Sequence, residues 1–160
     1  MKKILLAVMC VLMISTFCGC RKFAEYSEDD VYASEVRQLV DDSVKYTRIW
    51  QEYDRDFTCY DTQTAKEYMS ALEEIEKICK KLLSLMPSEK FEYNDESVKR
   101  SAGELLSVTS EIKDHIKYAV ETEDDILFQK EKNHLFALYM EYYEDLTDAS
   151  QYLQTFWRNA

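Results

Sequence analysis

Glycine and proline are nearly missing from this chain of 160 residues, which contains two glycines and one proline. Sheets with many tight turns need both residues, so their scarcity argues against a β-rich fold and favours long helices. The apolar fraction of 46% and the aromatic fraction of 13% exclude an intrinsically disordered chain. A chain of this length is sufficient for one domain with a single hydrophobic core.

Basic residues and catalytic motifs are scarce as well. Lysine and arginine together number 20 against 31 aspartates and glutamates, which gives a formal net charge of −11. Such a chain is repelled by nucleic acid, so we expect no nucleic-acid binding, whereas a cationic partner is compatible with this charge. The sequence has two histidines, no glycine-rich phosphate loop and no Ser-His-Asp pattern with recognisable spacing. We therefore expect no enzyme, and the remaining alternative is an active site assembled from scattered residues.

The only long apolar run lies at the N-terminus. It extends over residues 4–18 behind Lys2 and Lys3, and it is shorter than the roughly 20 residues that span a bilayer. A basic start followed by such a run is typical of a secretory signal peptide. An uncleaved membrane anchor is an alternative interpretation.

The end of this run has a distinctive sequence, Phe17-Cys18-Gly19-Cys20. It resembles the lipobox of bacterial lipoproteins, which consists of an aliphatic residue, a small residue, Gly or Ala, and Cys, with Phe17 where Leu is usual. The resemblance implies that residues 1–19 are removed and that lipid on Cys20 holds the protein on the outer face of a membrane in the bacterial cell envelope. An ordinary signal peptide cut near Gly19 is the simpler alternative.

This interpretation divides the chain into three parts, which are a signal peptide over residues 1–19, a linker over 20–26 and a helical-bundle domain over 27–158. The seven residues from Cys20 to Ser27 reach at most about 25 Å. The folded domain is therefore expected close to the bilayer.

Capping patterns predict where the helices begin. Candidate N-cap residues stand at Ser27, at Asp61 or Thr64, at Asn94 and at Thr122. Asn94 is followed by two acids, which favour the positive end of the helix dipole, and Tyr93 and Val98 occupy the positions of a hydrophobic staple. These patterns predict helices near residues 27–57, 62–86, 95–120 and 123–157.

Apolar residues recur at alternating spacings of three and four in the last three predicted helices, as in helical bundles. Those of the first predicted helix are less regular and form a broad stripe. We call each set an apolar seam. The four seams are Tyr32, Val36, Leu39, Val40, Val44, Trp50 and Phe57; Ala65, Tyr68, Leu72, Ile75, Cys79, Leu82 and Met86; Val98, Ala102, Leu105, Thr109, Ile112, Ile116 and Ala119; and Leu135, Tyr139, Tyr142, Leu146, Ala149, Leu153 and Phe156. Because short connections place neighbouring helices antiparallel, we predict an all-α, up-down-up-down four-helix bundle. The alternative joins the last two helices into one and leaves a three-helix array.

Small residues inside the predicted helices are interpreted as packing features. Gly103 is expected to be tolerated or to allow close packing, at a cost of about 1 kcal/mol relative to Ala. Cys79 lies on an apolar seam and behaves as a small apolar side chain. About fifteen helical residues separate Cys79 from the turn that holds Cys59, which places them roughly 25 Å apart, too far for a disulfide bond.

A metal site is the more specific hypothesis for function. Glu131 and His134 have the Glu-x-x-His spacing of di-iron carboxylate bundles, which use two such motifs. The other histidine, His115, has Ile112 at the matching position, so the second motif is incomplete. Haem is an alternative ligand, but there is no Cys-x-x-Cys-His motif. We expect no cofactor, with both histidines at the borders of their seams.

Aromatic residues are concentrated in the last predicted helix, and tyrosines of this kind usually place the ring in the core and the hydroxyl at its rim. They are also common at partner-binding hot spots. If a binding face exists, Tyr143, Tyr152 and Trp157 are its candidate residues. The sequence thus predicts a lipid-anchored, non-enzymatic interaction module with an unidentified protein partner, and a metal- or haem-binding bundle is the alternative.

Overall fold

The computed structural model describes residues 28–53 and 62–158, and the described residues contain helices and no strand. The helices are α2 (Glu28–Tyr53), α3 (Thr62–Ser84), α4 (Glu92–Thr122) and α5 (Asp125–Arg158), with a short 3₁₀ helix, η1 (Glu89–Phe91), before α4. The all-α prediction is confirmed. None of the described helices contains a stretch that is both long and apolar enough to span a bilayer.

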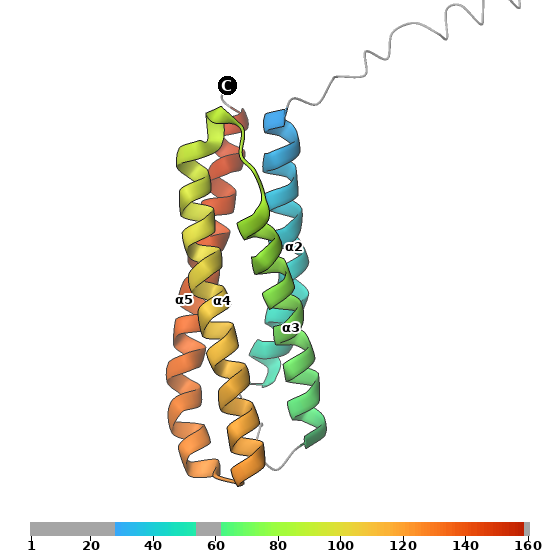
Figure 1. The fold of residues 1–160 in the computed structure, drawn as a ribbon, viewed down its shortest axis with the longest axis vertical. Coiled ribbons are helices and arrows are strands. Elements are labelled where there is room, and N and C mark those ends of the chain that lie inside the picture. Colours follow the sequence, from blue (N-terminus) through green and yellow to red (C-terminus); the bar gives the residue numbers. More distant parts are fainter. Residues whose placement is uncertain (1–27, 54–61, 159–160) are drawn as a thin grey trace, which may run out of the picture.

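The four helices form a closed antiparallel bundle (Figure 1). Successive helices run in opposite directions and pack against each other, and α2 also packs against α5, which closes the ring. The beginning of α2, the beginning of α4 and the end of α5 lie at the same end of the bundle. The three-helix alternative is wrong because Glu123 takes the left-handed conformation, with φ of 55°, that terminates α4.

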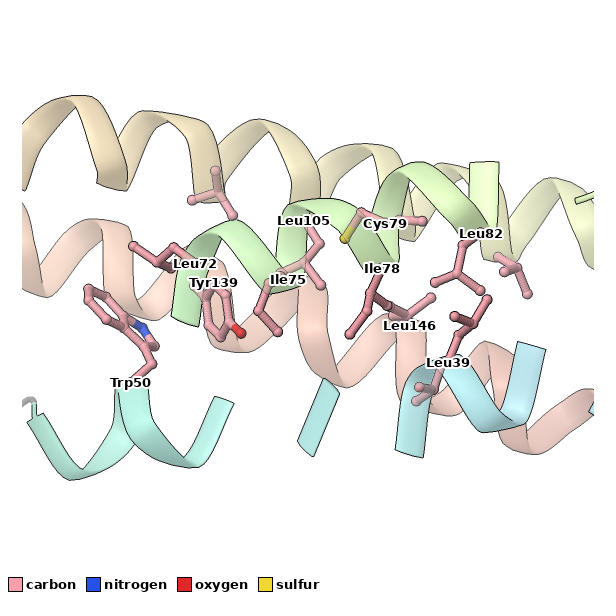
Figure 2. Packing of buried hydrophobic residues seen from close by; sticks show 14 of the residues in the cluster. Leu39, Trp50, Leu72, Ile75, Ile78, Cys79, Leu82, Leu105, Tyr139 and Leu146 are labelled. Atoms are coloured by element: carbon pink, nitrogen blue, oxygen red, sulfur yellow. The ribbon is translucent and has the colours of Figure 1, made fainter. Parts of the chain in front are cut away.

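The predicted apolar seams form the core (Figure 2). All seven seam residues of α4 are buried. Met86 is an exception and lies exposed in the connection that follows α3. A residue before proline is disfavoured in the helical conformation, so Pro87 excludes Met86 from the helix. Phe57 and Phe156 lie outside the residues whose side chains the structure describes.

The predicted cap at Asn94 is wrong, because α4 already begins at Glu92 and Asn94 lies within its first turn. The start is determined by Phe91, which is fully buried with its ring centroid 5.8 Å from that of Tyr32. The predicted staple is also wrong, since Tyr93 is 82% exposed to solvent. Residues five apart differ by about 140° around a helix, so burying Val98 directs Tyr93 outward.

The start of α5 also differs from its predicted cap, and one of the two candidate caps of α3 is excluded. Thr122 is the last residue of α4, and its hydroxyl donates to the backbone oxygen of Tyr118 at 2.8 Å, while α5 begins at Asp125. Since α3 begins at Thr62, Thr64 lies in its first turn and is not the cap. Ser27 and Asp61 lie outside the described residues.

Buried polar side chains at the end where α2 begins link α2 to α4. The Tyr32 hydroxyl donates to Asp95 Oδ1 at 2.6 Å, and Lys99 Nζ lies 2.7 Å from Asp95 Oδ2. Burial, followed by this hydrogen bond, raises the pKa of Tyr32. The Asp95 carboxylate, which is itself buried, therefore joins α4 to α2 through Oδ1, while Oδ2 pairs with Lys99 within α4.

Candidate functional site

A groove of about 440 Å³ runs between α4 and α5. Its walls include Tyr93, Ser97 and Arg100 from α4 and Asp145, Asp148 and Tyr152 from α5. Tyr93 is the second residue of α4, and Tyr152 precedes the last residue of α5 by six positions. The groove, called here the α4–α5 groove, therefore opens near the end of the bundle where α2 begins (Figure 1).

Two tyrosine side chains stand exposed at this groove. Tyr93 is 82% and Tyr152 60% exposed to solvent. Tyr152 comes directly before the buried seam residue Leu153, and consecutive residues point about 100° apart on a helix. Packing of the seam thus directs both phenol rings away from the core, one from each helix.

Three charged side chains line the same groove, namely Arg100, Asp145 and Asp148. None of the three is ion-paired with another described residue, whereas Lys99, next to Arg100, pairs with Asp95. The two aspartates are three residues apart and so lie on one face of α5. The groove therefore offers charges that the bundle itself does not neutralise.

A serine with little solvent exposure also lines this groove. Ser101 is only 3% exposed, yet it contributes to the groove wall. No hydrogen bond joins its hydroxyl to another described residue, and the hydroxyl oxygen is not fully enclosed by the protein. The groove thus contains a polar group that can hydrogen-bond a ligand.

Comparisons of the chain with protein-family models, with curated proteins and with solved structures gave no match. Any functional argument must therefore start from this geometry and from the sequence.

The structure separates the three tyrosine and tryptophan candidates. Tyr152 lines the groove. Tyr143 does not, because its ring stacks on Tyr139 with centroids 6.2 Å apart and its hydroxyl lies 3.5 Å from Ser43 Oγ. This half-buried position matches the core-and-rim interpretation of the tyrosines. The side chain of Trp157 and all of Cys20 lie outside the described residues.

Among the described side chains of α5, Tyr139 belongs to the core, and Phe136 and Tyr142 pack against it. Tyr139 is fully buried, and its hydroxyl is hydrogen-bonded to that of Thr47 at 2.8 Å. The ring of Trp50 packs against those of Tyr68, Phe136 and Tyr139, with centroids between 5.5 and 6.0 Å apart. Burial raises the pKa of Tyr139, so its hydroxyl stays protonated at neutral pH.

The alternative prediction was a metal site at Glu131, His134 and His115. The part of the chain that the structure describes contains no cluster of metal ligands. No group of three or more His, Cys, Asp or Glu side chains there is arranged to hold an ion. His115 is half-buried on α4 and His134 is exposed on α5, and a Glu131 carboxylate oxygen lies 4.0 Å from Lys130 Nζ. These positions supply no geometric support for a site formed by the three residues.

Cys79 is a fully buried free thiol. Burial raises its pKa to about 12. The thiolate is the reactive form of cysteine, so Cys79 is inert at neutral pH and acts as a core residue. Cys59 lies outside the described residues.

Most groove residues were not candidates in the sequence. Tyr93 was assigned to a staple, and Arg100, Asp145 and Asp148 resemble ordinary surface charges. One available signal was the position of Tyr93 on the side of its helix opposite the seam. The meeting of these residues across two helices could not be read from the pattern of either helix alone.

Proposed function

We propose that this protein is a lipid-anchored, extracytoplasmic helical module that binds a partner through the α4–α5 groove and catalyses no reaction. The observation that carries the binding proposal is the combination, at one groove, of two exposed tyrosines with three charged side chains that no other described residue pairs with. The anchor is supported by the lipobox sequence that ends at Cys20.

The exposed tyrosines favour binding on energetic grounds. A tyrosine side chain can bury roughly 150–250 Å² of surface in a contact, and its ring loses little conformational entropy on binding because it has two side-chain torsions. Tyrosine is accordingly enriched among the residues that dominate binding energy. Tyr93 and Tyr152, which are 82% and 60% exposed, together offer a contact of this kind.

The position of the groove is compatible with the proposed anchor. The described chain begins at Glu28, eight residues after Cys20, and α2 starts at the same end of the bundle as the groove. A lipid on Cys20 would hold this end near the bilayer, since eight residues reach less than about 30 Å. Partners at or near the membrane surface would therefore meet the groove first.

The anchor is tested by labelling growing cells with radioactive palmitate. We expect the wild type and Cys59→Ala, the matched control, to carry label that Cys20→Ala lacks. Label retained by Cys20→Ala would refute the lipid anchor.

Partner binding is tested with a photoreactive amino acid placed at Tyr152 in native membranes. The matched control is Tyr118, which is also exposed and lies on α4 outside the groove. We expect discrete crosslinked species from position 152 and none from position 118. Equal crosslinking from both positions, or none from either, would refute binding at the groove.

A further inference from the structure

The charges and rings of the α4–α5 groove point to the chemical class of its partner. We infer that the groove binds a basic peptide segment, with a lysine or arginine side chain held by Asp145 and Asp148 against the tyrosine rings. This inference rests on the proposed binding function and adds the chemistry of the partner.

The two carboxylates are the first reason to expect a basic partner. Asp145 and Asp148 face the groove from one side of α5, and neither is neutralised by another described residue. The opposite wall carries one cation, Arg100, so the groove holds an excess of negative charge. The net charge of −11 on the whole chain adds a long-range attraction that speeds the approach of cationic partners.

The two tyrosine rings are the second reason to expect a lysine or arginine side chain in the groove. An ammonium or guanidinium group within about 6 Å of an aromatic ring is attracted to the face of the ring. This fold already contains such contacts, since Lys45 Nζ lies 4.5 Å from the Tyr46 ring centroid and Lys90 Nζ lies 5.6 Å from that of Phe91. Tyr93 and Tyr152 offer rings of the same kind, and the aliphatic stem of a lysine can cover their apolar surface.

Two polar groups favour a peptide over a simple cation. The hydroxyl of Ser101, a residue that is only 3% exposed, has no hydrogen-bond partner among the described residues and can bond a peptide carbonyl or N–H group. Arg100 can donate to a peptide carbonyl oxygen. Tyr93 and Arg100 are seven positions apart, which is about 10 Å along α4 and matches about three residues of extended chain.

The inference is tested on the purified full chain in detergent by fluorescence anisotropy. The probes are fluorescein-labelled trilysine, triarginine and triglutamate amides. We expect the two basic peptides to bind and triglutamate not to bind. In the Asp145→Asn/Asp148→Asn variant we expect affinity for trilysine to fall about tenfold, as loss of close charge contacts implies.

The matched control is Glu141→Gln/Glu144→Gln, which removes the same charge from exposed residues of the same helix outside the groove. We expect it to weaken trilysine binding by less than about twofold, since distant exposed charges are screened. Likewise, Tyr152→Ala should weaken binding and Tyr118→Ala should not. Circular dichroism of each variant checks that the helices are retained.

Equal weakening by the two double variants would overturn the inference, because it would show attraction to acidic surface in general. Binding of triglutamate as strong as that of trilysine would also overturn it. If no basic peptide binds but position 152 still crosslinks to a partner in membranes, the partner class is wrong while the binding function stands. If neither binding nor crosslinking occurs, both proposals fail.

Discussion

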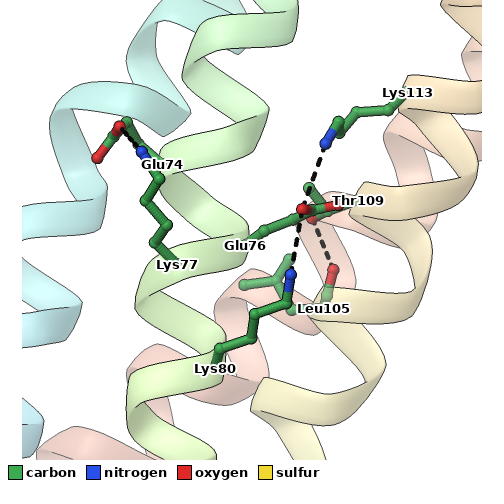
Figure 3. Close-up of polar contacts among 7 residues, drawn as sticks. All are labelled: Glu74, Glu76, Lys77, Lys80, Leu105, Thr109 and Lys113. Carbon is green, nitrogen blue, oxygen red and sulfur yellow. Dashed lines mark hydrogen bonds and ion pairs between the residues drawn. The ribbon is translucent and has the colours of Figure 1, made fainter.

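Two glutamates on α3 allow a direct comparison of a sheltered ion pair with an exposed one (Figure 3). Glu76 reaches Lys113 on α4 at 3.2 Å and Lys80 on its own helix at 3.5 Å. Glu74 pairs only locally, with Lys77, at the shorter distance of 2.6 Å. We predict that Glu76→Gln destabilises the bundle and that Glu74→Gln does not, although Glu74 makes the shorter contact.

Solvent exposure is the reason for this difference. The side chains of Glu76 and Lys113 are 14% and 18% exposed, whereas those of Glu74 and Lys77 are 38% and 67% exposed. Water screens the exposed pair, and exposed pairs contribute little to stability. Partly buried ion pairs are screened much less than exposed ones. The expected cost therefore lies above the roughly 0.2–1 kcal/mol of an exposed pair and below the roughly 3–5 kcal/mol lost when a fully buried pair is broken, and we expect Glu76→Gln to cost about 1–2 kcal/mol.

Urea unfolding followed by circular dichroism at the helix signal measures the effect. With a slope typical of small domains, this loss lowers the midpoint by roughly 0.5–1 M urea, while Glu74→Gln should leave it unchanged. The Glu76→Gln and Lys113→Met changes should also be non-additive, because each removes the same contact. A midpoint shift for Glu74→Gln as large as that for Glu76→Gln would refute the argument from burial.

Three further predictions concern other parts of the bundle. Gly103→Ala should raise the free energy of unfolding by roughly 0.5–1 kcal/mol in urea titrations, because a Cβ there meets no atom within 4 Å; destabilisation would contradict this. Tyr32→Phe and Asp95→Asn should show a coupling energy of about 1–2 kcal/mol in a double-mutant cycle, since they share a buried hydrogen bond; additive effects would argue against it. Stability should fall above pH 9, because burial raises the pKa of Cys79 from 9.0 to about 12 and the unfolded thiol ionises first. The slope approaches about 1.4 kcal/mol per pH unit between the two pKa values, and the loss from pH 8 to 10 totals about 1.4 kcal/mol. Urea midpoints over this range should fall more steeply for wild type than for Cys79→Ala; equal slopes would refute this assignment.

The fold follows closely from periodicity in the sequence. Each apolar seam identifies the face of a helix that must be buried, and the scarcity of glycine and proline leaves few places where a helix can end. All seven predicted seam residues of α4 are buried, from Val98 to Ala119. The exact helix ends were less predictable, because local capping at Asn94 competed with burial of Phe91 and burial determined the start.

The candidate site was predictable only in part. Tyr152 is a candidate binding residue in the sequence because it is an aromatic side chain in a helix rich in aromatics. It lines a groove, and binding there stays a prediction. Tyr143 has the same residue type in the same helix, but its ring stacks on Tyr139. Residue type and helix position alone do not separate the two, since their surroundings come from other helices.

The sequence by itself determined that this protein is helical and which face of each helix is buried, because 3.6-residue periodicity is a property of each segment alone. It also contains the segment ending at Cys20 that resembles a lipobox. Only the tertiary structure placed α4 beside α5 so that Tyr93, Arg100, Asp148 and Tyr152 share one groove. The physical reason is that a surface site depends on which polar helix faces are adjacent, and packing of the apolar seams determines which faces these are.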